Sequence, residues 1–347
     1  MRKLIGGQMG FINKDNKKFN LLKKQQIFCN GRSALYAILK KIKNKINRVY
    51  VPTYLCKSIL QPIKEIGLNY KFYKIKNNFN YNLPIKKNSA VIFLNYFGNI
   101  NKRYKFLKNN YKKNIFYIKD CTHDIFNKYH NINNFNKREI YKFASIRKYM
   151  PFSLGAITNL KSLKLNAPNK EEIKIFNRSY KNLFIRGKYF SYPLKTIDNS
   201  LEKKMLTEQS NFKIFENKNI LNSRLPKHIE RKLVKYNLKK NLKKRLDNYL
   251  FLKKELNCKI NIISKTSSFP LYLTILLNQN NKKILKFLHK HRVFACNLWK
   301  LPKEVSKKKY KESHNLSKRL ISLPVDHRYK KEDIKFMASI LHKALKI

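Results

Sequence analysis

The chain has 347 residues, a hydrophobic content of 43% and a formal net charge of +60. A chain of this length and apolar content can bury a substantial core, which excludes an intrinsically disordered protein and indicates about two domains. Its 79 Lys and Arg residues are spread from Arg2 to Lys346 and do not cluster. We therefore expect non-specific, salt-sensitive adhesion to polyanions and no dedicated nucleic-acid site.

The cysteines and the lengths of the apolar runs indicate in which cellular compartment the protein is located. The five cysteines are scattered and include no Cys-x-x-Cys pair, which argues for reduced thiols and against a disulfide or zinc framework. No apolar run approaches the roughly 18 residues of a membrane span. The first residues, MRKLIGGQMGF, lack the apolar segment of a signal peptide. We expect a cytoplasmic protein that needs no metal and no membrane.

In the first half of the chain, short apolar strands alternate with longer helical stretches. The predicted strands are 48–52, 70–75, 90–98, 114–120 and 141–146, and the predicted helices are about 32–45, 55–66 and 101–113. Such alternation is typical of an α/β fold with a mainly parallel, doubly wound sheet and helices on both faces. Ligands of such sheets bind at the carboxyl ends of strands, where Asp120 lies.

The second half begins with a long basic helical region from Pro226 to about Glu255. Beyond it, the predicted elements are strand-like segments at 269–277 and 293–299, a helix near 280–291 and a closing helix near 331–345. This pattern indicates a smaller C-terminal α/β domain. We expect a large domain over residues 1–235 and a small domain over residues 236–347.

Asp120 and Lys148 are the most informative pair in the chain. Only 19 of the 347 residues are Asp or Glu, so an aspartate at the end of an apolar strand is unusual, whereas a lysine at one position carries little information. Both residues follow predicted strands, so both fall at the carboxyl edge of the sheet. The pair suits pyridoxal 5′-phosphate (PLP). A lysine amine holds this cofactor as a Schiff base, and a buried carboxylate keeps the pyridine nitrogen protonated.

A phosphate site is predicted at the start of the helix near residue 32. Gly31 and Ser33 place small residues there, where backbone N–H groups and the positive end of the helix dipole attract a phosphate. An ordinary helix cap by Asn30 or Ser33 is the alternative. Ser145 precedes Lys148 by three positions and is a second candidate donor to the phosphate, unless it bonds only to backbone.

Other polar residues near these strand ends are weaker candidates. His123 is expected close to the cofactor or to Asp120, with a purely structural histidine as the alternative. Arg147 is a candidate partner for an anionic group, with a solvated surface arginine as the alternative. Tyr54 and Tyr96 are candidates for stacking or hydrogen bonding in the pocket, and ordinary packing is their alternative.

Several segments, in this order, resemble the DegT/StrS-like sugar-nucleotide aminotransferases, which are fold type I PLP enzymes. They are GRSAL (31–35), VPTYLCKSILQPIKEIG (51–67), NYFG (95–98), IKDCTHDIF (118–126), ASIRKYMPFSLGA (144–156) and LSKRLISLPVDHRYKKEDIKFMASIL (316–341). The resemblance implies that Lys148 is the Schiff-base lysine and proton shuttle. It also implies that Asp120 is the partner of the pyridine nitrogen and that His123 lies near the ring hydroxyl.

The same resemblance assigns the remaining cofactor contacts. The phosphate-binding positions fall on Gly31, Arg32, Ser33 and Ser145. The position where many members stack an aromatic ring over PLP falls on Cys56, a departure with two alternatives: Tyr54 or His123 compensates, or the stack is lost. The resemblance further implies a homodimer with shared active sites, in which Asn211 reaches the phosphate bound by the neighbouring subunit.

The function that the resemblance implies is transamination. An amino donor such as glutamate would pass its nitrogen to a keto-sugar nucleotide, in surface-polysaccharide or other amino-sugar biosynthesis. Two alternatives stay open at this point. One is a PLP-dependent dehydratase that acts on the sugar, and the other is a non-catalytic binding protein of the same fold.

Overall fold

The computed structural model describes most of the chain. The described residues are 4–7, 9, 26–84, 86–99, 114–126, 140–160, 165–191, 199–218, 222–236, 238–256, 260–264 and 269–346. The predicted helix at 101–113 lies outside them. None of the described helices is long and apolar enough to cross a membrane.

A seven-stranded sheet forms the larger part of the described molecule, with strand order β2-β8-β7-β6-β5-β3-β4. Its strands are β2 (Ile27–Phe28), β3 (Arg48–Pro52), β4 (Tyr70–Tyr73), β5 (Ser89–Leu94), β6 (Ile115–Asp120), β7 (Tyr141–Ala144) and β8 (Ala156–Thr158). The five strands β3 to β7 are parallel to one another, whereas β8 runs antiparallel to both β7 and β2. The mainly parallel sheet is confirmed, and the antiparallel pair β2 and β8 is an addition that the sequence did not indicate.

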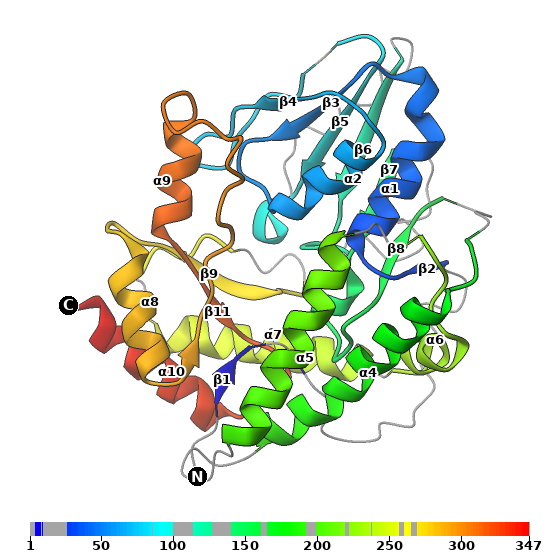
Figure 1. Cartoon of the computed structure of the whole chain (residues 1–347). Helices are drawn as coiled ribbons and strands as arrows, with labels where there is room; N and C mark the ends of the chain where they lie inside the picture. The colour runs from blue at the N-terminus through cyan, green and yellow to red at the C-terminus, as the bar shows by residue number, and fades with distance from the viewer. Residues whose placement is uncertain are drawn as a thin grey trace.

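Helices lie on both faces of this sheet, as predicted. On one face, α1 (Gly31–Ile42) and α2 (Leu60–Glu65) pack against inward side chains such as Ala90 and Ile92 of β5 (Figure 1). On the other face, Val91 and Phe93 of the same strand pack in an aromatic cluster with α9 (Lys311–Arg319). Successive β5 residues therefore serve opposite faces, which explains the continuous apolar run in this strand.

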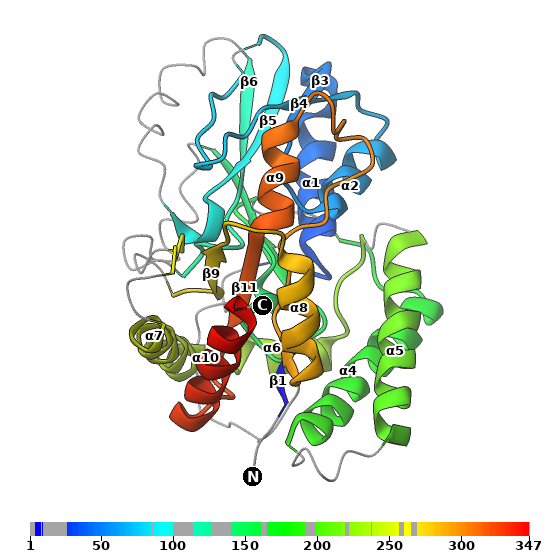
Figure 2. The same ribbon diagram turned by 90° about the vertical axis from the view of Figure 1, so that its left-hand side faces the viewer.

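Four helices connect the main sheet to the C-terminal part. Helices α4 (Lys170–Ser191) and α5 (Asn199–Lys218) lie side by side (Figure 2) and were not predicted. The basic region predicted from Pro226 to Glu255 forms two helices, α6 (Lys227–Val234) and α7 (Leu238–Glu255).

The C-terminal part has its own core. Strand β9 (Tyr272–Leu276) pairs antiparallel with β11 (Leu320–Pro324), and β1 (Ile5–Gly6) pairs with β10 (Val293–Phe294). Helices α8 (Asn281–Lys290) and α10 (Lys331–Leu345) pack with α7 around buried residues of these strands. The segment predicted as a strand at 293–299 is a strand only at its start. The domain boundary expected after residue 235 stays a prediction.

Candidate active site

A cavity of about 320 Å³ lies at the carboxyl ends of β6 and β7, beside the start of α1. We call it the first cavity, and its size is within the range of small-molecule sites. Most of the residues predicted to form the site line it, namely Gly31, Arg32, Cys56, Asp120, His123, Ser145 and Lys148. Ser33 and Tyr54 are not among its lining residues.

Asp120 and Lys148 are positioned by adjacent strands. Asp120 is the last residue of β6, and its Oδ1 accepts the backbone N–H of Thr122 at 2.9 Å. Lys148 ends the 3-10 turn Ile146–Lys148 that follows β7. Burial raises the pKa of the Asp120 carboxyl, whereas the Thr122 hydrogen bond and the charge of Lys148 lower it. Within the described part of the chain, no cationic side chain forms an ion pair with Asp120.

His123 is held in one neutral form. Its Nδ1 accepts the backbone N–H of Phe97 at 3.2 Å, so the neutral ring carries its proton on Nε2. Burial, aided by the nearby charge of Lys148, lowers the pKa of His123 to about 3. The imidazole ring stacks on Trp299 with centroids 5.4 Å apart and planes inclined by 21°. His123 can therefore donate one hydrogen bond from Nε2 at neutral pH.

At the start of α1, the structure shows the helix cap that the sequence left open as the alternative to a phosphate site. Asn30 is the helix cap, because its Oδ1 accepts the backbone N–H of Ser33 at 2.9 Å and the Ser33 hydroxyl at 3.1 Å. The structure therefore does not bring the Ser33 side chain to the cavity. A Cβ atom on Gly31 would lie 3.5 Å from Cβ of Ser145, an ordinary van der Waals distance, so the first turn of the helix lies close to Ser145.

Glu216 of α5 is a site residue that the sequence did not indicate. Its Oε1 accepts Nδ2 of Asn30 at 2.8 Å, and its Oε2 pairs with Nη2 of Arg32 at 2.5 Å. Nη2 of Arg147 lies 3.8 Å from Oε1. Burial alone would raise the pKa of Glu216, but the charges of Arg147 and Arg32 and the two hydrogen bonds hold it below its usual value. Glu216 thus fixes the groups around the start of α1.

Alongside Phe143 and Phe212, the cavity is lined by Trp299, the only tryptophan of the chain. Tyr54 is fully buried behind it, with ring centroids 5.5 Å apart. Cys56 lines the cavity, and its Sγ lies 3.1 Å from Oγ of Ser58. The uniqueness of Trp299 was a signal in the sequence, but its distance along the chain from the other site residues concealed its role. Asn211 on α5 does not line this cavity, and its contact with a neighbouring subunit stays a prediction.

Comparison with known proteins identifies the fold. No family model and no curated protein matches the chain. Among solved structures, PseC from Helicobacter pylori, an aminotransferase involved in the biosynthesis of pseudoaminic acid, is similar with a TM-score of 0.64. It is 14% identical in sequence, over 99% of this chain and 100% of its own.

Two further structures show the same likeness. The sugar aminotransferase CalS13 from Micromonospora echinospora has a TM-score of 0.64 at 10% identity, over 98% of this chain and 100% of its own. A DegT DnrJ EryC1 StrS aminotransferase from Brucella abortus has a TM-score of 0.59 at 14% identity, over 92% of this chain and 85% of its own. The chain therefore has the fold of these sugar aminotransferases, and the predicted fold type I architecture is confirmed.

Proposed function

We propose that this protein is a PLP-dependent aminotransferase that acts on a keto-sugar nucleotide. The observation that carries the proposal is that Lys148 and Asp120 line one cavity at the carboxyl ends of two adjacent parallel strands. The fold shared with solved sugar aminotransferases supports it. A further neighbour, from Streptococcus pneumoniae, has been solved in a PLP form and a PMP form.

The residues of the first cavity fit PLP. Asp120 lacks an ion-pair partner among the described residues, and a protonated pyridine nitrogen would provide one. The start of α1, Ser145 and the guanidinium groups of Arg32 and Arg147 lie together around the same cavity, which suits a phosphate. Glu216 offsets part of this positive charge and keeps both arginines in place.

Each residue then has a defined task. PLP supplies a ring that withdraws electrons from the substrate carbon bound to nitrogen. Nζ of Lys148 would hold the cofactor and would also serve as the base that carries a proton to and from that carbon. Asp120 would keep the pyridine nitrogen protonated, and neutral His123 offers its Nε2–H as a donor to the ring hydroxyl.

The finer parts of the proposal concern the partners. Glutamate is the amino donor, the enzyme is a cytoplasmic homodimer, and the product serves surface-polysaccharide or other amino-sugar biosynthesis. The family resemblance of the sequence supports these assignments, and the role of the Helicobacter pylori neighbour in the biosynthesis of pseudoaminic acid supports the biosynthetic one.

The experiment is to mix the purified protein with PLP and record its visible absorption before and after borohydride reduction. We expect a visible band that borohydride removes, with the reduced adduct mapped to Lys148. Lys148→Ala should lack the band, whereas Lys181→Ala, an exposed lysine of α4, should keep it. Release of 2-oxoglutarate from glutamate separates transamination from sugar dehydration. A wild-type band in Lys148→Ala would overturn the proposal.

A further inference from the structure

A second cavity, of about 550 Å³, adjoins the first. Arg147, Lys148, Arg186 and Gln209 line both cavities. The remaining walls come from α4 and α5, the N-terminal segment around Gly6 and the C-terminal segments around Phe294 and Pro324. A ligand in this cavity would therefore lie next to Lys148, and the volume suits a ligand larger than an amino acid.

Arg186 of α4 is a buried cation without a carboxylate partner among the described residues. Its exposed fraction is 3%, and its Nε has no hydrogen-bond partner in the described ranges. Burial and the adjacent charge of Arg147 lower the pKa of Arg186 to about 10, so it stays charged at neutral pH. Within the part of the chain that the structure describes, Nε of Arg147 also lacks a partner, and its Nη1 donates to the Ser153 carbonyl at 3.2 Å. An unpaired buried charge is unfavourable, and an anionic ligand relieves that penalty.

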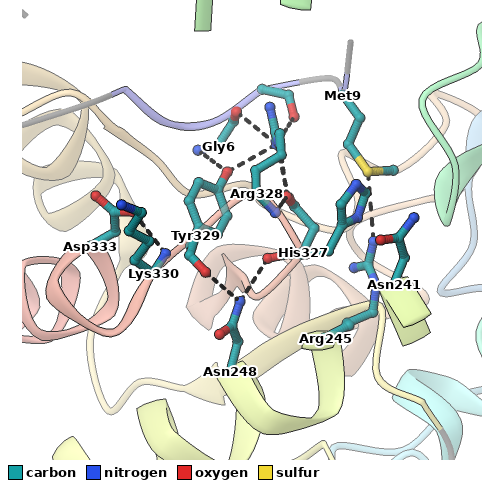
Figure 3. Close-up of polar contacts among 12 residues, drawn as sticks. Gly6, Met9, Asn241, Arg245, Asn248, His327, Arg328, Tyr329, Lys330 and Asp333 are labelled. Atoms are coloured by element: carbon teal, nitrogen blue, oxygen red, sulfur yellow. Dashed lines mark hydrogen bonds and ion pairs between the residues drawn. The ribbon is translucent and has the colours of Figure 1, made fainter. Parts of the chain in front are cut away.

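Arg245 of α7 is a second buried guanidinium at this cavity, with an exposed fraction of 2%. Its Nη1 donates to the Leu271 carbonyl at 2.9 Å. Its Nη2 is 3.8 Å from Sδ of Met9, a contact drawn in Figure 3. A thioether sulfur is a weak acceptor, so Nη2 is available to a stronger one. Arg245 and Arg186 come from different helices and supply two sources of positive charge.

The carboxylate nearest to Arg245 is already engaged. Asp326 accepts Nε and Nη2 of Arg328 at 2.7 Å and 2.8 Å. Arg328 also donates to the carbonyls of Gly6 and Gly7, while the Gly6 N–H donates to Oη of Tyr329 (Figure 3). This network fixes the N-terminal segment as a wall of the cavity. Among the described residues, Asp326 feels the charge of Arg245 but pairs with Arg328, whereas Arg186 pairs with no carboxylate.

We propose that the second cavity binds the diphosphate of the substrate, with Arg186 contacting one phosphoryl group and Arg245 the other. This inference rests on the proposed function for its choice of substrate. Guanidinium groups bind phosphate oxygens in pairs of parallel hydrogen bonds. Two separated guanidinium sites in a cavity of this volume favour a diphosphate over the single carboxylate group of an amino donor next to Lys148.

The test is calorimetric titration of the PLP-loaded protein with inorganic pyrophosphate at about 150 mM salt, which suppresses non-specific anion binding. We expect Arg186→Met to weaken binding at least tenfold and Arg186→Lys to restore part of it. The matched control is Arg178→Met on the same helix, because Arg178 pairs with Glu208 and its side chain is 42% exposed. This control should bind pyrophosphate like the wild type. Arg245→Met is a second variant with the same expected loss.

The outcomes separate this proposal from its rivals. Equal affinities in Arg186→Met, Arg245→Met and Arg178→Met would overturn it. So would a loss of the PLP band in Arg186→Met with pyrophosphate binding intact, because the arginine would then serve the cofactor. If Arg186→Met weakened the binding of glutamate and left the binding of pyrophosphate unchanged, the site would belong to the amino donor. That result would also overturn the proposal. Failure of the proposed function would appear differently, as a wild-type protein without a lysine-bound PLP band.

Discussion

The two cavities meet at Lys148, but their charged groups are held in different ways. Around the start of α1, Glu216 binds Asn30 and Arg32 directly, so the protein itself fixes these groups. Around the second cavity, Arg186 lacks a carboxylate partner among the described residues, and one arm of Arg245 contacts only a thioether. Groups with protein partners are in place before a ligand arrives.

This difference separates the expected effects of substitutions. In the first cavity they should change the chemistry of the cofactor or the stability of the fold. In the second cavity they should change the affinity for an anionic ligand and leave the cofactor bound. A variant that affects both cavities equally would show that the two are a single site.

The largest expected effect is that of Asp120→Asn on amino transfer. An amide cannot balance a positive pyridine nitrogen, so we expect kcat to fall by about 10²–10³-fold, the magnitude typical of losing one electrostatic group at a reacting centre. Pyrophosphate affinity should stay at the wild-type value, because Asp120 does not line the second cavity. Steady-state kinetics and calorimetry on the same preparation measure both quantities.

The control for this variant is Asp247→Asn, an exposed aspartate of α7, which should retain wild-type kinetics. A wild-type rate in Asp120→Asn would remove Asp120 from the mechanism. A parallel loss of pyrophosphate binding would remove the distinction between the cavities.

The next effect in size is a loss of stability in Glu216→Gln. This change leaves the guanidinium of Arg32, whose side chain is 10% exposed, without its counter-charge, and breaking an ion pair that is largely buried costs up to about 3–5 kcal/mol. Glu208→Gln is the matched control on the same helix. It breaks the partly exposed pair with Arg178, and we expect a loss of about 1 kcal/mol or less. Urea unfolding of the cofactor-free proteins measures both, and equal losses would contradict the assignment.

The pH dependence gives the Glu216 comparison a second readout. The pKa of Glu216 is lower in the folded protein than its usual value of 4.5, so its stabilisation is present above that pH. It is lost as the pH falls through the folded pKa. The gap in unfolding free energy between wild type and Glu216→Gln should therefore be widest near neutral pH and narrow on acidification.

The parts of the molecule that could be predicted from sequence depend on local signals. Strand β3 and helix α10 have the predicted bounds, because apolar runs and helical periodicity are visible in short windows. Asp120 and Lys148 were found because the carboxyl ends of parallel strands meet at one edge of a sheet. Strand β5 was predicted too long, since Tyr96–Gly98 turns away as a 3-10 helix with Phe97 at φ 54°.

The residues that could not be predicted reach the site through tertiary packing. Helix α4 had a usable signal, because Phe176, Leu183 and Phe190 are buried at a spacing of seven. Nothing in that spacing shows that Arg186 faces a cavity shared with Lys148, or that Glu216 of α5 meets the cap of α1. These contacts depend on how helices distant in sequence pack on the sheet edge.

The smallest expected effect is a titration that does not occur. Burial, with a further contribution from Lys148, lowers the pKa of His123 to about 3, so its ring should stay neutral from pH 5 to 8. In protein labelled with ¹³C-histidine, the His123 resonance, identified by its loss in His123→Gln, should not move over this range. The unfolded chain does bind a proton at this residue below about pH 6.5, so His123 lowers the stability of the fold as the pH falls from there toward 3.

Lys148→Ala sharpens the last test. Burial is the larger cause of the shift in pKa and Lys148 the smaller, so the His123 resonance should stay fixed in this variant as well. A resonance that titrates near pH 6.5 only in Lys148→Ala would make the lysine charge the main cause. A resonance that titrates in the wild type would place His123 in water and remove its neutral Nε2 donor. The first cavity would then resemble the second, because the protonation of His123 would depend on a bound ligand and not on the fold.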